Sequence, residues 1–306
     1  MGYKVPILFL IYNRQKETET VFKCIRDIRP DDMFVVADGP KKENTDDILK
    51  CNNTRDVVNN NVDWECNLTK IYRKENMGCK LSVYNGISEF MNKYGYGIIL
   101  EDDTVPNKSF FKYCEELLEK YKNDERIAVI SGDNFIPSKH IKNSYEFSKY
   151  PLIWGWATWK RVWDKYDVSM KEWEHFKKDE MLDSVFDTVE ERKYWTNIFN
   201  KQYNNEIDAW DYQLSFLCMK NKLLSIYPKY NLVKNIGIGS KDAAHTKKYK
   251  REYVKETSEL MFPLDHPNDI YINRDNDLLI SRLRFGIKKK NIYTKIKNIF
   301  KKVLRV

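Results

Sequence analysis

The sequence predicts an α/β fold in which a mostly parallel central sheet is flanked by helices on both faces. Short apolar runs typical of buried strands alternate with helix-length segments through the first 150 residues. Three of these runs end in polar clusters, as is common at the carboxyl ends of parallel strands. A length of 306 residues suits one large α/β domain, and 42% hydrophobic residues are enough to build its core.

Five apolar segments of the first half are expected to be strands. The first, at residues 5–12, is a continuous apolar run, as a strand buried on both faces requires. The predicted strands cover residues 5–12, 33–37, 68–72, 97–100 and 127–130. The predicted helices cover residues 15–28, 46–58, 79–94 and 109–121.

The second half, from about Pro151, is rich in aromatic residues. Seven of the eight tryptophans lie there, among predicted helices and irregular segments with one strand-like stretch at residues 223–227. No low-complexity linker separates the halves. We therefore expect one unit at residues 1–286, with halves at 1–150 and 151–286, and a tail at 287–306.

The tail carries the whole net charge of the chain. Its seven lysines and one arginine contribute +8 with no acid, which leaves residues 1–286 at zero out of the total of +8. A basic body that wraps nucleic acid is therefore disfavoured. Apolar residues recur in the tail at helical spacing, which predicts a basic amphipathic helix on an anionic membrane surface. The alternatives are a helix packed on the domain and a nucleic-acid arm.

The sequence contains no apolar run of about 18 residues and no recognisable secretion signal. Its six cysteines are scattered without a C-x-x-C pair, which argues against a zinc ribbon or a redox dithiol. The expected location is the cytoplasm, with the tail as a peripheral contact to the inner face of the cell membrane.

Three consecutive acids, Glu101, Asp102 and Asp103, follow the predicted strand at 97–100. We call them the acidic triplet. Their negative charges repel one another, so the three carboxylates cannot be buried without a positively charged partner. A divalent cation that also contacts phosphates resolves this, because Mg²⁺ or Mn²⁺ combines one or two carboxylates with phosphate oxygens and water. The alternative is an acidic turn on the solvated surface.

With this triplet the chain resembles the GT-A glycosyltransferases, near family 2 and the N-acetylglucosaminyltransferase I-like group. In those families a D-x-D-type motif, often E-D-D, holds the metal and the nucleotide diphosphate. The resemblance implies that Asp103 binds Mn²⁺ or Mg²⁺, that Asp102 contacts the donor sugar or ribose, and that Glu101 contacts the nucleotide.

The resemblance extends to two other polar clusters and to a helix start. Tyr12, Asn13 and Arg14 after the first strand, and Asp38 after the second, are similar to the base-binding positions of these families. Lys80 lies in a segment similar to N-x-G ahead of a helix, where a cation can approach phosphate. Its alternative role is a solvated helix lysine.

Inverting sugar transfer needs a carboxylate that takes the proton of the acceptor hydroxyl. Asp211 is the first candidate and Asp208 the second, since both lie where a helix to Asn221 is predicted to start. Asp208 is also a candidate N-cap of that helix. The alternative is that both acids only stabilise the helix start.

Three further residues are predicted near the sugar. Trp156, in the segment W-G-W-A-T-W, is expected to stack on a sugar ring. Asp133, in S-G-D-N after a strand, is expected to hold donor-sugar hydroxyls. Residues 237–246 read as a glycine-containing lid. Within this lid, His245 resembles a late histidine that contacts metal or diphosphate in the family, and its alternative is an exposed loop histidine.

These features predict a metal-dependent hexosyl- or N-acetylhexosaminyltransferase. The expected donor is a nucleotide-diphosphate sugar, with UDP as the nucleotide, and the expected acceptor is a saccharide or lipid-linked glycan in cell-surface polysaccharide synthesis. A sugar nucleotidyltransferase is the first alternative, although those enzymes carry a glycine-rich basic loop after the first strand and the segment I-Y-N-R-Q-K-E has no glycine. A non-catalytic carbohydrate-binding or scaffold protein is the second.

Overall fold

A computed structural model of the chain describes residues 2–178, 181–239 and 255–287. Within these residues an eight-stranded sheet has the order β3-β2-β1-β4-β8-β6-β9-β7, and β10 and β5 form a separate two-stranded ribbon. The strands are β1 Ile7–Ile11, β2 Asp32–Ala37, β3 Asn67–Tyr72, β4 Tyr96–Glu101, β5 Thr104–Pro106, β6 Ile127–Ser131, β7 Tyr145–Ser148, β8 Trp156–Trp159, β9 Leu224–Pro228 and β10 Val233–Asn235.

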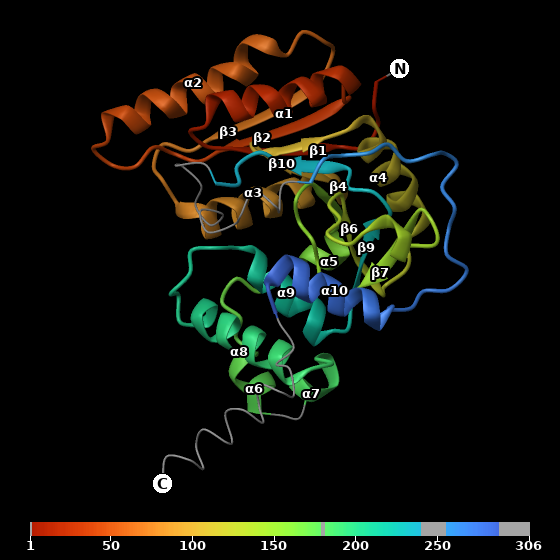
Figure 1. Ribbon diagram of the computed structural model, residues 1–306. Helices are drawn as coiled ribbons and strands as arrows, with labels where there is room; N and C mark the ends of the chain where they lie inside the picture. The colour runs from red at the N-terminus through yellow and green to blue at the C-terminus, as the bar shows by residue number, and fades with distance from the viewer. Residues whose placement is uncertain (1, 179–180, 240–254, 288–306) are drawn as a thin grey trace.

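Helices cover both faces of this sheet, as predicted for an α/β fold. Helices α1 and α2 lie on one side of β1 to β3, and α3 lies on the other side (Figure 1). The helices are α1 Gln15–Ile28, α2 Thr45–Asn61, α3 Gly78–Tyr94, α4 Lys108–Lys120, α5 Lys160–Trp163, α6 Trp173–Lys178, α7 Met181–Val185, α8 Val189–Tyr203, α9 Asp211–Lys220 and α10 Arg274–Phe285.

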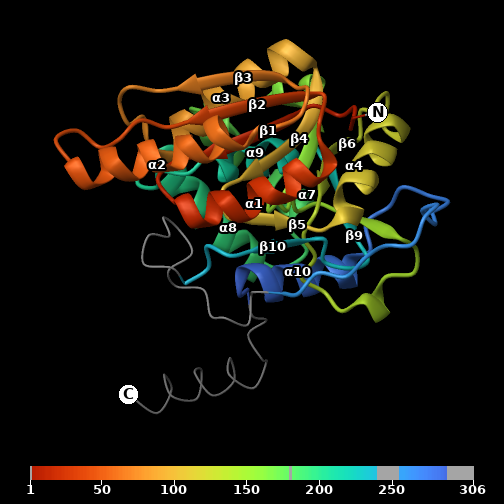
Figure 2. The same ribbon diagram turned by 90° about the horizontal axis from the view of Figure 1, so that it is seen from above.

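The sheet is mostly parallel. Strand β1 pairs in parallel with β2 and with β4, β2 pairs in parallel with β3, and β6 pairs in parallel with β9. The four strands β3, β2, β1 and β4 lie side by side in this order (Figure 2). Strand β8 is inserted antiparallel between β4 and β6, and β7 is an antiparallel edge strand. The carboxyl ends of β1, β2, β4 and β6 therefore meet at one edge, which we call the carboxyl rim.

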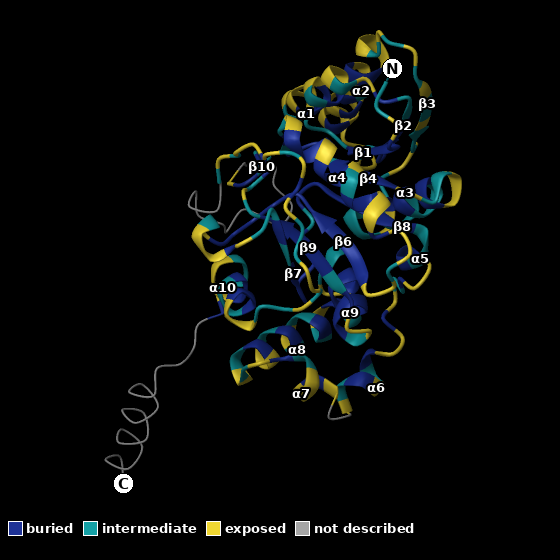
Figure 3. Ribbon diagram, turned by 90° about the vertical axis from the view of Figure 1, so that its right-hand side faces the viewer, coloured by how far each residue is buried: buried dark blue, intermediate teal, exposed yellow. Residues whose placement is uncertain are grey.

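The centre of the sheet is the main core. All residues of β1 and of β6 are buried, and β6 and β9 form the dark interior in Figure 3. This burial confirms that the continuous apolar run at residues 5–12 marks a strand covered on both faces. Helix α1 contributes Val21, Phe22 and Ile25 from one face to this core, because Ile25 lies four residues after Val21 and three after Phe22.

The second half contains more strand than the sequence predicted. Strands β8 and β10 lie in segments that were expected to be helical or irregular, so that expectation was wrong. Strand β8 has only four residues, all of them buried, and β10 has three. Such short segments show no readable alternation of apolar and polar residues.

The tryptophans of the second half are mainly core residues. A second hydrophobic cluster contains Trp173, Trp195, Phe199 and Phe216, all of them buried. The rings of Trp173 and Phe216 meet edge to face with centroids 5.6 Å apart, a favourable aromatic geometry. Aromatic packing therefore explains much of the composition of this half.

Two predictions fall outside the described residues, namely the role of His245 and the amphipathic helix at 288–306. Within the residues that the structure describes, no helix has the length and apolar character needed to cross a membrane.

Candidate functional site

The structure brings three predicted polar clusters together at the carboxyl rim. Residue Ile11 at the end of β1 pairs with Ala37 at the end of β2, and Leu10 of β1 pairs with Glu101 at the end of β4. The polar residues that follow these strands therefore lie on the same edge of the sheet. This edge is where ligands bind in open α/β sheets.

Arg14 holds two members of the acidic triplet. Its guanidinium donates through Nε to Asp102 at 3.2 Å, through Nη1 to Asp103 at 2.9 Å, and through Nη2 to the second oxygen of Asp102. Asp102 is 3% and Asp103 8% exposed, so both carboxylates need this partner. Asp102 and Asp103 are therefore buried at a turn, and Glu101 beside them is half-buried.

Burial and the neighbouring negative charges raise the pKa values of Glu101 and Asp102. Burial, followed by the charges of Asp103 and Asp102 and with a contribution from Asp211, raises the pKa of Glu101 to about 8. Burial raises the pKa of Asp102 to about 6, against the opposing charge of Arg14. Glu101 therefore holds its proton more strongly than an ordinary glutamate does.

Asp38 ties the end of β2 to the start of α3. Its Oδ1 accepts hydrogen bonds from the amides of Gly39 at 2.8 Å and Met77 at 3.0 Å, and its Oδ2 accepts one from Asn76 Nδ2 at 3.1 Å. Burial raises the pKa of this carboxyl although these hydrogen bonds oppose the shift. Asp38 therefore fixes the backbone next to the start of α3 at the carboxyl rim.

Tyr12 and Asn13 share a partner that the sequence did not indicate. Tyr12 Oη donates to Asp47 Oδ2 and Asn13 Nδ2 donates to Asp47 Oδ1, each at 2.6 Å. The amide of Lys41 also donates to Asp47 Oδ2 at 2.6 Å. Asp47, in the first turn of α2, therefore fixes the residues after β1. No sequence pattern singles it out among the acids of that helix.

Asp208 is not the N-cap of α9, so that prediction was wrong. The N-cap position belongs to Trp210 and has no side-chain cap. The carboxylate of Asp208 instead accepts from the amides of Cys79 at 3.0 Å and Lys80 at 2.9 Å, which begin α3. This contact joins the loop before α9 to the first turn of α3.

Lys80 is held in the same contact region. Its Nζ donates to Asn205 Oδ1 at 2.6 Å, across 125 positions of sequence. Its amide belongs to the helix start that Asp208 caps. Lys80 therefore lies beside the rim but is directed at the loop before α9 in this structure.

Asp211 lies near the acidic triplet, as the predicted role of an acceptor-side carboxylate requires. It is the first residue of α9 and is half-buried. Its charge adds to burial in raising the pKa values of Glu101 and of the Cys79 thiol. The structure thus places Asp211 close to the end of β4, with about 110 residues between them in the chain.

Trp156 is a core residue, and the prediction that its ring stacks on a sugar was wrong. The side chain is fully buried, and its ring stacks on Trp210 with centroids 5.5 Å apart and planes at 18°. Both faces of such a ring are unavailable to a ligand. The same residue type serves core packing and sugar recognition, and the sequence pattern did not separate the two.

Asp133 is a buried carboxylate without a hydrogen-bonding side chain to balance it. It is 2% exposed, and neither carboxylate oxygen makes a hydrogen bond that meets standard geometry with the described residues. It lines a small pocket of about 10 Å³ with Trp154, Asn235 and Lys255. That volume is about what one water or one hydroxyl group needs. Burial raises the pKa of Asp133 to about 7, against the opposing charge of Arg284.

The first residue of the predicted lid, Gly237, packs directly against Asp103 of the acidic triplet. A Cβ built on Gly237 lies 2.1 Å from Asp103 Oδ2 and 2.9 Å from Arg14 Nη1, so only glycine fits here without displacement. The Gly237 amide donates to Asn235 Oδ1 at 2.9 Å. Asn235 also lines the Asp133 pocket, so this short segment connects Asp103 with Asp133.

Gly237→Ala is expected to destabilise the protein by about 1–3 kcal/mol, because an added methyl group overpacks the ion pair. It should also weaken nucleotide binding at the rim. Gly239→Ala is the matched control, since no atom lies within 4 Å of its added Cβ and only its φ of +75° carries a cost of about 1 kcal/mol. Denaturant unfolding and nucleotide titration of both variants test this. Equal affinities in the two variants would contradict the predicted contact.

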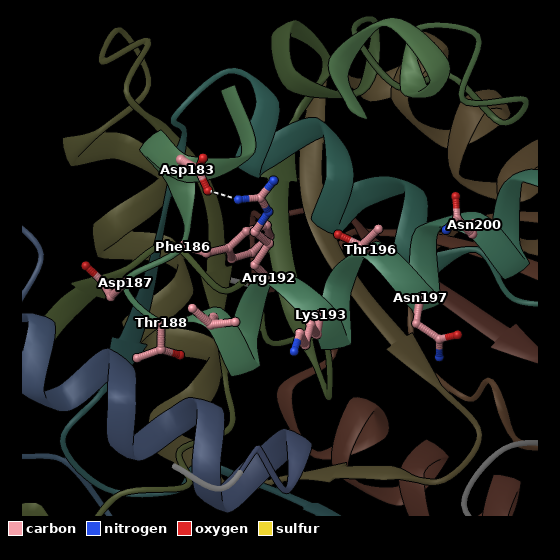
Figure 4. A pocket seen from close by; sticks show the side chains of 10 residues that line it. Asp183, Phe186, Asp187, Thr188, Arg192, Lys193, Thr196, Asn197 and Asn200 are labelled. Atoms are coloured by element: carbon pink, nitrogen blue, oxygen red, sulfur yellow. Dashed lines mark hydrogen bonds and ion pairs between the residues drawn. The ribbon is translucent and has the colours of Figure 1, made fainter. Parts of the chain in front are cut away.

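A separate pocket of about 610 Å³ lies along α7 and α8 (Figure 4). Phe186, Lys193, Thr196 and Asn197 line it, and Arg192 forms an ion pair with Asp183 at its edge. None of the predicted site residues lines this pocket. We place the candidate site at the carboxyl rim because the buried, charged and mutually perturbed groups lie there.

The carboxylates of the carboxyl rim do not by themselves form a complete site for a divalent cation. Among residues 2–178, 181–239 and 255–287, no group of three His, Cys, Asp or Glu side chains is arranged as a complete metal site. Asp102 and Asp103 are nevertheless the type of donor that Mg²⁺ and Mn²⁺ use together with phosphate oxygens. Asp102 and Asp103 therefore suit a cation that takes its remaining ligands from the oxygens of a bound phosphate.

No protein-family model and no curated protein matches this chain. Similar solved structures are a UDP-glucose pyrophosphorylase complexed with UDP-glucose, with 9% identity, a TM-score of 0.35, and coverage of 74% of this chain and 90% of that one. The apo form of a UDP-glucose pyrophosphorylase has 9% identity and a TM-score of 0.35, with coverage of 76% and 93%.

A third similar structure is the 4-diphosphocytidyl-2C-methyl-D-erythritol synthase from Anaerococcus prevotii DSM 20548. It has 11% identity and a TM-score of 0.30, with coverage of 71% of this chain and 98% of that one. None of these three proteins is named a glycosyltransferase, so membership in glycosyltransferase family 2 is not confirmed. Because all three TM-scores lie below 0.5, the functional proposal below is based on the site residues.

Proposed function

We propose that this protein is a transferase that binds a nucleotide-diphosphate sugar at the carboxyl rim and moves the sugar to a saccharide acceptor. The main support is the buried arrangement of Arg14, Asp102 and Asp103, with Asp211 on the acceptor side of the same rim. A buried anionic pair with one resident cation suits a ligand that combines a diphosphate with a divalent metal.

In this proposal Asp103, with Asp102 beside it, holds Mn²⁺ or Mg²⁺ next to the diphosphate. The metal supplies positive charge to the departing diphosphate. Arg14 lies within hydrogen-bond distance of both carboxylates and is placed to donate to the same phosphates. The protein thus concentrates positive charge where the leaving group develops negative charge.

Asp211 is the proposed base. It is half-buried at the start of α9, and its charge contributes to the raised pKa of Glu101. Asp208, the second candidate, has both oxygens engaged by backbone amides of α3. A carboxylate whose two oxygens are both engaged by backbone amides is poorly placed to contact an acceptor hydroxyl. We therefore assign the proton transfer to Asp211.

Asp133 is proposed to accept a hydrogen bond from one sugar hydroxyl. Its pocket has room for a single such group, and its amide neighbours are already used. Asn134 donates to the carbonyl of Lys229 at 2.9 Å and Asn235 accepts from Gly237 at 2.9 Å. We therefore assign the sugar hydroxyl to the Asp133 carboxylate, which no described side chain engages by a hydrogen bond.

Asp133→Asn is expected to stabilise the unliganded protein at pH 8 but not at pH 4. Burial raises the pKa of the native carboxyl to about 7, whereas in the unfolded chain the carboxyl has its ordinary pKa of 3.8. Wild-type stability therefore falls as pH rises from about 4 to about 7, by at most about 4 kcal/mol. Asparagine carries no such penalty. Urea unfolding of both proteins at the two pH values measures the difference.

The same variant should weaken binding of the nucleotide sugar and leave binding of the nucleotide diphosphate unchanged, since only the sugar reaches Asp133. A hydrogen bond to a charged group is worth about 1.5–3 kcal/mol, or roughly 10- to 150-fold in affinity. Equal loss for both ligands would contradict the proposed sugar contact.

Sugar-nucleotide synthesis is the second candidate, because such an enzyme would also bind a nucleotide at the carboxyl rim of an α/β sheet. Against it, β1 ends at Ile11 and α1 begins at Gln15, so only three residues connect them and none is glycine. Little backbone is available there to surround a triphosphate. The non-catalytic alternative is less favoured because it leaves the buried acids of the rim without a role.

One assay separates the three functions. The protein is incubated with UDP-sugars and Mn²⁺, with and without saccharide acceptors and with and without pyrophosphate. Release of UDP indicates glycosyl transfer, formation of UTP only with pyrophosphate indicates nucleotidyl transfer, and binding without either product indicates a binding protein. Lipid-linked acceptors belong in the same screen, because the basic tail at 287–306 favours an acceptor at the inner membrane surface.

A further inference from the structure

Arg14 occupies the place where a cation would be expected beside the acidic triplet. Its three donor nitrogens contact three of the four carboxylate oxygens of Asp102 and Asp103. The guanidinium side chain is only 17% exposed. A free divalent cation therefore meets carboxylates that are already bound and partly withdrawn from water.

The segment after β10 closes this ion pair from one side. The backbone at Gly237 packs so tightly on it that even one methyl group would contact both Asp103 and Arg14. The amide of Ile236 also donates to the carbonyl of Asp103 at 2.8 Å, which fixes the turn. Displacement of Arg14 thus needs a new partner for its charge, because an unpaired buried guanidinium is costly.

The charge balance points in the same direction. Two carboxylates and one guanidinium sum to −1. Adding a divalent cation alone gives +1 in a buried place, and like charges then face each other. A diphosphate with two or more negative charges removes this excess, supplies ligands to the cation, and provides oxygens to Arg14.

We infer that Arg14 makes the acidic triplet selective, so that a divalent cation binds there only together with a diphosphate group. This inference rests on the proposed function and deepens it by assigning a role to Arg14 toward the metal. The diphosphate releases Arg14 from Asp103 and takes it as its own partner, and the cation then binds the freed carboxylate.

Manganese binding by the full chain tests this directly, because free Mn²⁺ gives an electron paramagnetic resonance signal that is lost on binding. Wild type is expected to bind Mn²⁺ weakly alone or with uridine, and at least about tenfold more tightly with UDP. Inorganic pyrophosphate in a parallel titration shows whether the diphosphate alone is enough. Wild type that binds Mn²⁺ equally well with and without UDP overturns the inference.

Arg14→Gln should bind Mn²⁺ without any nucleotide, at least about tenfold more tightly than wild type, since its carboxylates are no longer occupied. Mn²⁺ alone should then raise the melting temperature of this variant but not of wild type. Arg14→Lys, which keeps the charge but not the three-point contact, serves if the glutamine variant does not fold, and an intermediate Mn²⁺ affinity is expected. Mn²⁺ affinities that equal the wild-type value in both variants, measured without nucleotide, contradict the inference.

These outcomes separate the inference from the proposed function. If UDP binds to wild type and Mn²⁺ binding is independent of Arg14, only the inference is wrong. If UDP does not bind under any condition, yet Arg14→Gln gains a manganese site, the proposed function is wrong and the role of Arg14 at the triplet remains.

Discussion

Asp103→Asn is expected to lower kcat/KM for sugar transfer by about a thousandfold, the loss typical when one group that stabilises transition-state charge is removed. Asp103 lies at the turn after β4, 8% exposed, with its carboxylate on Arg14 Nη1 at 2.9 Å. The amide has nearly the same shape but no charge, so it cannot balance a cation beside the diphosphate. Steady-state kinetics with saturating Mn²⁺ measure the change.

The matched control is Asp63→Asn. Asp63 is an exposed acid that pairs with Arg26 away from the rim. Exposed ion pairs contribute little, so kcat/KM should stay within about twofold of wild type. If Asp103→Asn also stays within that range, the catalytic assignment of the acidic triplet is wrong.

Asp211→Asn is expected to lower kcat by about 10²- to 10⁴-fold, the usual contribution of a general base, with donor affinity retained. The residue starts α9 and its charge contributes to the raised pKa of Glu101, whereas Asp208 caps the start of α3. The pH–rate profile supplies a second readout, because the acidic limb of wild type should disappear in the variant. Donor binding by titration shows that the rim itself remains intact.

Asp208→Asn provides the comparison for this experiment. The amide keeps one acceptor oxygen for the two backbone amides that the carboxylate now serves. The variant should lose about 1 kcal/mol of stability, as for a weakened helix cap, and should retain the acidic limb of the profile. If Asp208→Asn removes that limb and Asp211→Asn does not, the two roles are reversed.

The sheet and its carboxyl rim could be predicted from the sequence, because apolar runs and helical spacing are visible within short segments of the chain. Residues 5–12 form an unbroken apolar run because β1 is buried on both faces. The predicted helix at 15–28 agrees with α1 at Gln15–Ile28. Polar clusters at strand ends then followed from the parallel topology.

The partners of the site residues could not be predicted in the same way. Asp208 meets Cys79 across 129 positions, and Arg14 meets Asp102 across 88. Such contacts depend on tertiary packing, which no local periodicity records. Trp156 shows a second limit, since its segment is equally compatible with a sugar-binding surface and with strand β8, and burial decided between them.

The contact of Asp208 with the first turn of α3 has a consequence for ligand binding. Helix α3 begins beside Asp38 at the donor side, while the loop that carries Asp208 leads directly into Asp211 at the acceptor side. A shift of one side can therefore reach the other through the hydrogen bonds of Asp208 with α3. Thermodynamic linkage then requires reciprocity: if donor occupancy tightens acceptor binding by some factor, acceptor occupancy must tighten donor binding by the same factor.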